Sequence, residues 1–260
     1  MHVIAVVFAA LLVLVTTSSA VSAEPVPLLE WDVVSRRTHD TGAFTQGLQL
    51  ASLGRLYEST GRYGESTLRE TDADSGEVLR SLALRDEWFG EGLALLDEDL
   101  IQLTWRAGIA VRRDVKTFEL VDTYDYEGEG WGLCFDGERL VMSDGSDRLT
   151  FRDAGTFEAT GSLAVTFEGQ PLGRLNELEC VEGSVWANVW GSDAIVRIDP
   201  ADGRVDGLLD LRGILEPHPA ASDAGAVLNG IAWNATTGTF LVTGKLWPEL
   251  IEIRVSDPAP

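Results

Sequence analysis

Hydrophobic and polar residues along the chain alternate in short segments separated by turns. Runs rich in Val, Leu, Ile and aromatic residues end at clusters of Gly, Asp or Asn. Such runs are typical of β-strands, and the clusters between them are typical of hairpin turns. One example is the strand predicted over 194–198, which is followed by a turn over 199–203 and a second strand over 205–211. The pattern therefore predicts an all-β protein built from antiparallel hairpins.

A short motif recurs five times. Its copies read FTQGL, FGEGL, EGWGL, LNELE and LNGIA, and they begin at positions 44, 89, 129, 175 and 228. The starts lie 40 to 53 residues apart, which is near the spacing of one four-stranded blade of a β-propeller. The five copies predict a five-bladed propeller with four-stranded antiparallel blades.

The last copy is too short to form a complete blade. After Asn229 it has room for three strands, the last over 250–255, whereas residues 29–37 precede the first copy and have no partner within it. We expect this N-terminal strand to close the last blade, because pairing the two ends of the chain removes a sheet edge. A solenoid is the alternative architecture, and it would leave the strand unexplained.

The first residues differ from the rest of the chain. Residues 3–15 are apolar, and small residues follow, ending in VSA at 21–23. This is typical of a signal peptide, although an uncleaved anchor is the alternative because no Lys or Arg precedes the apolar run. We expect a signal peptide over 1–23 and a single catalytic domain over 24–260. The protein would be secreted or periplasmic, with no stable membrane association after cleavage.

The charge and the cysteine content of the chain limit which ligands and which bonds are expected. The formal net charge is −22, which repels phosphate backbones, so we expect no nucleic acid. Cys134 and Cys180 could form one disulfide in an oxidising compartment or stay as two buried thiols, since their spacing does not decide. The sequence has no CxxC or HExxH motif, so it encodes no zinc site of the usual local forms.

Superposing the five copies predicts a ring of residues around the channel mouth. The first strand of each blade lines the channel of a propeller, and one position of the motif falls at one level there. That position is occupied by Gln46, Glu91, Trp131, Asn176 and Asn229. A water-filled polar channel without activity is the alternative interpretation.

A second column lies roughly 14 residues further along, where the second strand of each copy ends. A hairpin returns the chain to the end where it began, so both columns face one mouth. The column consists of Ser59 and Thr60, Trp105, Asp144, Trp190 and Lys245. Tryptophans in a propeller usually pack between blades, as Trp186 and Trp233 are expected to do. Repeated at strand ends beside a carboxylate, they favour a pocket wall.

These residue types suit one kind of chemistry. Desolvation raises the pKa of a glutamate such as Glu91 towards neutrality, where it can both accept and donate a proton. Aromatic faces hold an amine by cation–π attraction. Lys245, Asn176, Gln46 and an indole N–H can polarise an amide carbonyl or stabilise an oxyanion. The set suits an amine and an amide held together beside one acid/base group, without a metal.

The motifs also resemble a known family. Together with ESTG at 58–61, QLTW at 102–105, SDGS at 143–146, VW at 189–190 and TGKLWP at 243–248, they resemble the plant-type glutaminyl-peptide cyclotransferases, which also occur in bacteria. The resemblance runs in order from about Phe44 to the C-terminus. It implies a five-bladed propeller that converts the N-terminal glutamine of peptides into pyroglutamate with release of ammonia. This family is distinct from the zinc-dependent animal-type enzymes.

The resemblance also implies roles for individual residues. The acid/base glutamate falls on Glu91, and the substrate pocket falls on Phe44, Gln46, Trp105, Trp131, Asn176, Trp190 and Lys245. We predict that Glu91, Lys245 and Asn176 are catalytic, and we add Asp144 and Asn229 to the pocket from the two columns. We expect a monomer with no metal in the site and no required cofactor. Such propellers can hold a structural calcium, but nothing here fixes its ligands. The insertion 216–226, with His218, is interpreted as a solvated loop.

Two other functions remain open. Glu91, Asn176, Asn229 and Asp144 could coordinate calcium, as in calcium-dependent lactonase propellers, because such oxygen ligands suit that ion. Lys245 and three tryptophans would crowd a cation there. A non-catalytic peptide-binding propeller is the third hypothesis, and the presence of Glu91 weighs against it.

Overall fold

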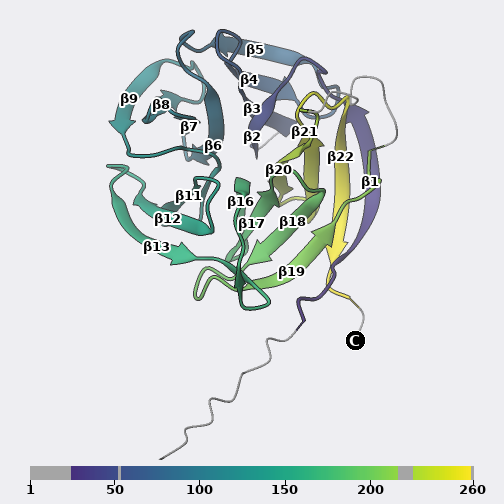
Figure 1. Cartoon of the computed structure of the whole chain (residues 1–260). Helices are drawn as coiled ribbons and strands as arrows, with labels where there is room; N and C mark the ends of the chain where they lie inside the picture. The colour runs from purple at the N-terminus through teal and green to yellow at the C-terminus, as the bar shows by residue number, and fades with distance from the viewer. Residues whose placement is uncertain (1–24, 52–53, 216–224, 259–260) are drawn as a thin grey trace, which may run out of the picture.

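The described part of the chain forms a ring of β-sheets. The computed structural model describes residues 25–51, 54–215 and 225–258. Within these residues the regular elements are strands, and they form five four-stranded antiparallel sheets around a central axis (Figure 1). The predicted five-bladed propeller is confirmed. Searched over the same residues, the structure has no helix long and apolar enough to cross a membrane. The predicted signal peptide and most of the insertion with His218 lie outside the described residues.

Each blade is an antiparallel meander that runs from the channel outwards. Blade 1 consists of β2 (Thr45–Leu50), β3 (Arg55–Thr60), β4 (Thr67–Asp72) and β5 (Val78–Ala83). Blade 2 consists of β6 (Gly90–Leu96), β7 (Asp99–Thr104), β8 (Ile109–Asp114) and β9 (Leu120–Asp125). Blade 3 consists of β10 (Leu133–Phe135), β11 (Arg139–Ser143), β12 (Arg148–Asp153) and β13 (Ala159–Ala164). Blade 4 consists of β16 (Leu175–Val181), β17 (Ser184–Val189), β18 (Ala194–Ile198) and β19 (Val205–Asp210). Blade 5 consists of β20 (Leu228–Asn234), β21 (Thr239–Gly244), β22 (Glu249–Ser256) and β1 (Glu30–Thr38). A small hairpin of β14 (Thr166–Phe167) and β15 (Gln170–Pro171) lies between blades 3 and 4 in the chain.

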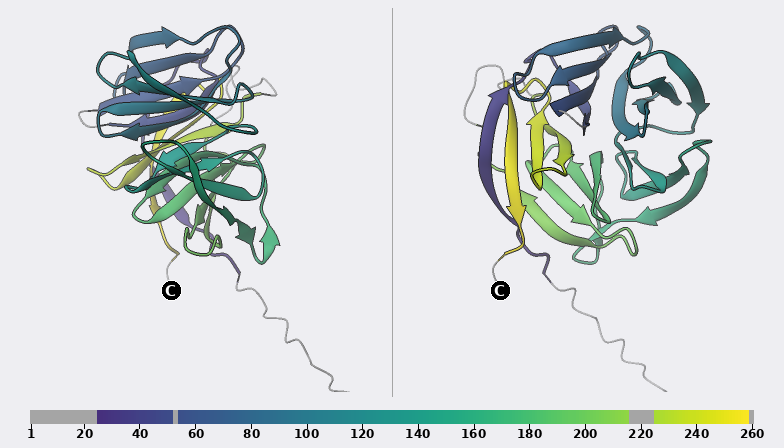
Figure 2. Two further views of the ribbon diagram at one scale, coloured as in Figure 1. Left: turned by 90° about the vertical axis from the view of Figure 1, so that its left-hand side faces the viewer. Right: turned by 180° about the vertical axis from the view of Figure 1, so that it is seen from behind.

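The N-terminal strand closes the ring as predicted. β1 pairs antiparallel with β22, so that Trp31 lies opposite Val255 and Arg37 opposite Leu250. The purple and yellow strands lie side by side in both views that show the ring face-on (Figures 1 and 2). Blade 5 therefore contains the first and the last strand of the described chain, and neither β1 nor β22 is left as an isolated strand.

The place of a strand in its blade explains its sequence. The inner strand β6 reads GEGLALL and is buried almost throughout, whereas the outer strand β9 reads LVDTYD and is mostly exposed. A strand covered on both faces needs continuous apolar residues, and an edge strand gains from charges that oppose pairing with other chains. In blade 2 this difference explains why the inner strand is apolar and the outer strand is polar.

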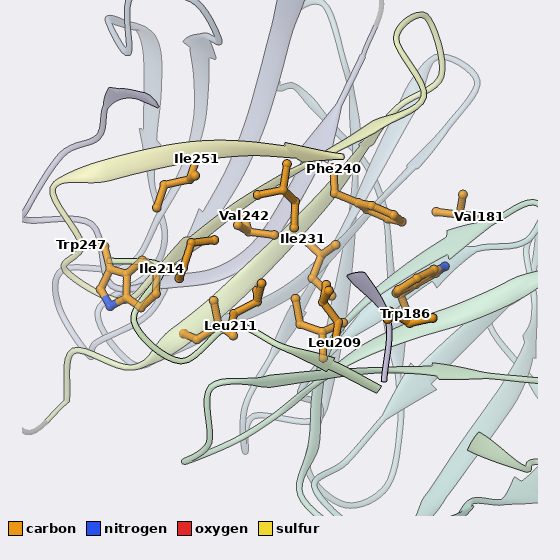
Figure 3. Packing of buried hydrophobic residues seen from close by; sticks show 14 residues of the cluster. Val181, Trp186, Leu209, Leu211, Ile214, Ile231, Phe240, Val242, Trp247 and Ile251 are labelled. Atoms are coloured by element: carbon orange, nitrogen blue, oxygen red, sulfur yellow. The ribbon is translucent and has the colours of Figure 1, made fainter. Parts of the chain in front are cut away.

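Hydrophobic clusters fill the space between neighbouring blades. The cluster between blades 4 and 5 contains Trp186, Leu209, Ile231 and Phe240, whose side chains point towards one another (Figure 3). The rings of Trp186 and Trp233 each lie 4.7 Å from that of Phe240, measured between centroids. The expectation that these two tryptophans pack between blades is confirmed.

The glycine of the motif lets the innermost strands approach one another. A Cβ atom on Gly47 would lie 2.5 Å from the backbone nitrogen of Leu93 in the next blade, a distance that no side chain tolerates. In blade 4 the same position holds Glu177 instead. Its carboxylate accepts hydrogen bonds from the backbone N–H groups of Leu48 (3.2 Å) and Ile231 (2.8 Å). Glu177 therefore ties blades 1, 4 and 5 together in the channel.

A disulfide joins two blades. Cys134 of β10 and Cys180 of β16 are bonded; they are 46 positions apart in sequence, and their Cα atoms are 5.5 Å apart. This decides between the two alternatives that the sequence left open. The bond links the inner strands of blades 3 and 4.

Replacing Cys134 and Cys180 together by alanine is expected to lower the free energy of unfolding by about 2–4 kcal/mol, because the crosslink restricts the unfolded chain. Urea unfolding followed by fluorescence measures this. Wild-type protein under reducing conditions is the control and should show a similar loss. An unchanged unfolding midpoint in both samples would contradict a stabilising disulfide.

Candidate active site

Both predicted columns lie at one end of the ring, which we call the mouth. It is formed where each inner strand begins and where its hairpin partner ends. Backbone hydrogen bonds fix these segments to one another, from Trp105 N to Phe89 O (2.9 Å) and from Leu246 N to Ala43 O (2.7 Å). The second of these bonds joins blade 5 to blade 1 beside Lys245.

The polar residues of the first column sit at irregularities in the inner strands. In four blades the pairing between the inner strand and its neighbour shifts register at this position. The shifts lie between Thr45 and Gly47, Gly90 and Leu93, Leu175 and Leu178, and Leu228 and Ile231. A bulge re-aims the side chain that it contains. The side chains at these positions therefore do not follow the regular alternation of a strand, in which successive side chains point to opposite faces of the sheet. They are Gln46, Glu91, Asn176 and Asn229.

Glu91 lies at the end of a hydrogen-bonded chain of amides. Gln46 Nε2 donates to Glu91 Oε1 (3.0 Å), and Asn229 Nδ2 donates to Gln46 Oε1 (3.3 Å) and to Thr45 O (3.0 Å). All three side chains are buried. Because the Gln46 Oε1 accepts from Asn229, the NH₂ group of Gln46 points towards Glu91. The hydrogen bond from this NH₂ group holds one oxygen of the Glu91 carboxylate in place.

Glu91 and Lys245 are two buried ionisable groups whose pKa values are shifted in opposite directions. Burial raises the pKa of Glu91 well above its ordinary value; the charge of Lys245 opposes this shift, and the charge of Glu129 adds to it. Burial lowers the pKa of Lys245 to about 8, although Glu91 acts in the other direction. The ammonium nitrogen lies 4.8 Å from the centroid of the Phe44 ring. Two groups with opposed shifts in one pocket are suited to moving protons near neutral pH.

The loop that carries Lys245 is held by a buried histidine. The backbone N–H of His39 donates to Pro248 O (2.8 Å), and its Nδ1 donates to Trp247 O (2.8 Å). Its Nε2 lies 3.0 Å from Glu58 Oε1. Burial by itself would lower the pKa of His39, but Glu58 and the Trp247 carbonyl outweigh it and raise that pKa. The ring therefore favours the charged form, which donates to both partners.

Aromatic rings form the wall around this pair. Phe89 lies edge-on to both Phe44 (6.2 Å between centroids) and Trp105 (5.5 Å). Trp131 lies edge-on to Trp190 (6.0 Å), whose side chain is exposed. Phe89 was not among the predicted site residues. It occupies the motif position that Phe44 occupies in the first copy, and this repeat could have identified it.

A second residue that sequence reasoning missed is Glu129. Its Oε2 accepts hydrogen bonds from the indole nitrogens of Trp105 (2.7 Å) and Trp131 (3.0 Å), and its Oε1 accepts one from Arg106 Nε (2.9 Å). These bonds keep the pKa of Glu129 below its usual value despite some burial. The indole N–H groups of Trp105 and Trp131 already donate to Glu129, so they do not donate to a substrate in this arrangement. Of the three pocket tryptophans Trp105, Trp131 and Trp190, only Trp190 has no acceptor for its indole N–H among the described residues.

Asn176 and Asp144 differ in their placement. Asn176 is buried, and its Oδ1, like that of Asn229, has no hydrogen-bond donor among the described residues. Buried acceptors of this kind normally meet water or a ligand. Asp144 is exposed and accepts a hydrogen bond from Ser146 N (2.9 Å) within its own turn. Among the described residues, no hydrogen bond joins Asp144 to Glu91.

The described residues contain no group of three or more His, Cys, Asp or Glu arranged to hold a metal ion. The predicted calcium ligands Glu91 and Asn229 are instead joined through Gln46. A separate cavity of about 370 Å³ between blades 4 and 5 is lined by Val181 and Ser184, whose turn lies at the opposite end of the ring from the mouth.

Comparison with known proteins assigns this architecture and sequence to a family. The family model described as glutamine cyclotransferase matches residues 5–255. The chain belongs to the glutamine cyclotransferase family. It is 41% identical over 231 residues to the glutaminyl-peptide cyclotransferase of Arabidopsis thaliana, a match that covers 87% of this chain and 71% of that protein.

Solved structures agree with the assignment to the glutamine cyclotransferase family. The crystal structure of Myxococcus xanthus glutaminyl cyclase matches with a TM-score of 0.83 and 38% identity, over 91% of this chain and all of that one. Kuenenia stuttgartiensis hydrazine synthase, at 15% identity and a TM-score of 0.51, shares the fold alone. The family resemblance predicted from the motifs is confirmed. The roles of individual residues stay predictions.

Proposed function

We propose that this chain is a glutaminyl-peptide cyclotransferase that converts the N-terminal glutamine of peptides into pyroglutamate and releases ammonia. The family and the Arabidopsis relative support this activity. The observation that carries the mechanism is the buried carboxylate of Glu91, held by Gln46, facing Lys245 and enclosed by aromatic rings.

The reaction needs one group that takes a proton and later returns it. The neutral α-amine of the substrate attacks the γ-carbonyl carbon of its own side chain and forms a C–N bond. Glu91, ionised at the start, accepts the proton that the attacking nitrogen loses. It then gives this proton to the amide nitrogen, which leaves as ammonia when the second C–N bond breaks. One carboxylate near both nitrogens serves both steps, and it is regenerated.

The other residues of the pocket stabilise charge and shape. Lys245, which is protonated below pH 8 because its pKa is about 8, offers a positive charge to the oxyanion of the tetrahedral intermediate, and the Asn176 amide offers a donor. Trp105, Trp131 and Trp190 enclose the bent conformer of the glutaminyl side chain. Holding that conformer is most of the task in an intramolecular cyclisation.

Ammonia release from a dipeptide that begins with glutamine tests the activity, and the same assay in chelator tests the need for a metal. We propose that no divalent cation is required, because Lys245 already supplies positive charge beside Glu91. Equal rates with and without chelator are expected. Activity that vanishes in chelator and returns with calcium or zinc would overturn the metal-free mechanism. No ammonia under any condition would overturn the function.

We also propose an extracytoplasmic, monomeric enzyme. The Cys134–Cys180 disulfide supports an oxidising compartment, and the apolar residues 3–15 support export. N-terminal sequencing of the mature protein tests cleavage after Ala23, and light scattering tests the oligomeric state. A mature protein that still begins at Met1, or a dimer in solution, would contradict the corresponding part.

Replacing Glu129 by glutamine is expected to lower kcat/KM for a Gln-initiated dipeptide by about ten-fold. One amide oxygen can still accept from both indole N–H groups, which share Oε2 in the wild type. The neutral amide is a weaker acceptor, and its NH₂ group would face the Arg106 donor that Oε1 accepts, so the anchor of Trp105 and Trp131 weakens and the pocket wall loosens. A shift in tryptophan fluorescence should accompany the loss. Glu138→Gln, in an exposed turn at the opposite end of the ring, is the matched control. Unchanged kinetics and fluorescence in Glu129→Gln would show that the carboxylate does not position these rings.

A further inference from the structure

Three arginines lie over the aromatic residues of the mouth. The guanidinium carbon of Arg62 lies 4.8 Å from the centroid of Phe44, that of Arg106 lies 3.8 Å from Trp105, and that of Arg174 lies 5.8 Å from Trp190. The chain has 42 acidic residues against 20 Lys and Arg. The three arginines therefore bring positive charge to the mouth, whereas the net charge of the whole chain is negative.

Two of these arginines have uncompensated charges. Arg106 forms an ion pair with Glu129 (2.9 Å). Among the described acidic residues, by contrast, none forms an ion pair with Arg62 or Arg174, although thirteen other arginine and lysine contacts of this kind occur elsewhere. Arg62 is half-buried and Arg174 is exposed, so both guanidinium groups can receive a ligand from solvent.

The backbone at both positions is held in an uncommon conformation. The φ angles are 90° at Arg62 and 66° at Arg174, in the left-handed region that favours glycine. Hydrogen bonds fix them there, from Ser66 Oγ to Arg62 O (2.7 Å) and from Trp190 N to Arg174 O (2.8 Å). Strained positions of this kind occur often at ligand sites. The surrounding structure thus sets where each side chain leaves the backbone.

We infer that Arg62, which follows β3 of blade 1, and Arg174, which precedes β16 of blade 4, are two points on the rim of the mouth that each attract a carboxylate of the substrate beyond its N-terminal glutamine. This rests on the proposed function, in which the glutamine fills the pocket and the rest of the peptide leaves through the mouth. The carboxylate is either the side chain of an acidic second residue or the free C-terminus of a short peptide. Guanidinium groups bind carboxylates with matched geometry.

The long-range charge of the protein does not cancel this preference. At physiological ionic strength the screening length is about 8 Å, so distant acidic residues contribute little to a carboxylate at the mouth. The effect of exposed charges on binding is modest. We therefore expect a several-fold preference rather than absolute selection, and we expect it mainly in KM.

The test compares wild-type kcat/KM for the amidated dipeptides Gln-Glu, Gln-Gln and Gln-Lys and for Gln-Gln with a free C-terminus. We expect Gln-Glu to exceed Gln-Lys by about five-fold at physiological ionic strength, and we expect the ratio to shrink at about 1 M salt, where the screening length falls to about 3 Å. Comparing free Gln-Gln with its amide separates the C-terminal carboxylate from an acidic side chain. In Arg62→Gln with Arg174→Gln, the Gln-Glu to Gln-Lys ratio should fall towards one. Arg254→Gln, at an exposed position of β22, is the control and should keep the wild-type ratio.

The readout is a ratio, so a general loss of activity in the double variant does not mimic the result. The single variants Arg62→Gln and Arg174→Gln should each lower the ratio in part, and they serve if the double variant does not fold. Equal cyclisation of all four peptides by wild-type enzyme, or an unchanged ratio in the variants, would overturn this inference and leave the proposed function intact. Cyclisation of none of the peptides would overturn both.

Discussion

Glu91→Gln is expected to lower kcat for a Gln-initiated dipeptide by about 100-fold or more, with little change in KM. The amide keeps the shape of the side chain and can still accept the hydrogen bond from Gln46. It cannot take the proton of the attacking amine or return it to the leaving nitrogen. The steady-state rate of ammonia release measures the loss.

Glu138→Gln is the matched control for this variant, because Glu138 lies in an exposed turn far from the mouth, and it should keep wild-type kcat. Near wild-type turnover by Glu91→Gln would show that Glu91 is not the proton shuttle. Asp144 would then be tested before Glu177, since the carboxylate of Glu177 is occupied by two backbone N–H groups.

Lys245→Met is expected to lower kcat/KM by about 100-fold, the usual effect of removing one donor to an oxyanion. Methionine keeps the apolar stem against Phe44 but removes the positive charge. The chain has one other lysine, Lys116, which pairs with Glu98 at the surface. Lys116→Met is therefore a matched control and should leave the kinetics unchanged. Wild-type kcat/KM in Lys245→Met would exclude a catalytic role.

The pH profile gives the same pair of groups a second test. Glu91 acts as a base only when ionised, so its raised pKa makes activity fall on the acid side at a higher pH than an ordinary glutamate would. Lys245 loses its charge as the pH rises through about 8, so activity falls on the alkaline side. In Lys245→Met the alkaline limb should disappear. The acid limb should move to higher pH, because the charge that stabilised ionised Glu91 is gone. If the pH profile of Lys245→Met equals that of the wild type, the charge of Lys245 does not influence the ionisation of Glu91.

Some features of the site lie beyond what a single sequence can show. The predicted indole donor to the oxyanion is limited to Trp190, because Glu129 accepts the N–H groups of Trp105 and Trp131. Glu129 follows Glu127 and Gly128 in an acidic turn, and nothing in that turn marks it as a partner of Trp105, which lies 24 residues away. Asp144, which the column placed in the pocket, is exposed in its own turn.

The sequence by itself determined the number of blades, the closure by β1 and the level of Glu91 in the ring. These depend on the repeat spacing and on local alternation of apolar and polar residues, both of which are properties of the chain. The tertiary structure decided how side chains from different blades meet. The bulges turn Gln46 and Asn229 into a chain that ends on Glu91, and His39 fixes the loop of Lys245. Such contacts join residues as many as 208 positions apart. They depend on the register and packing of neighbouring sheets, which no local pattern encodes.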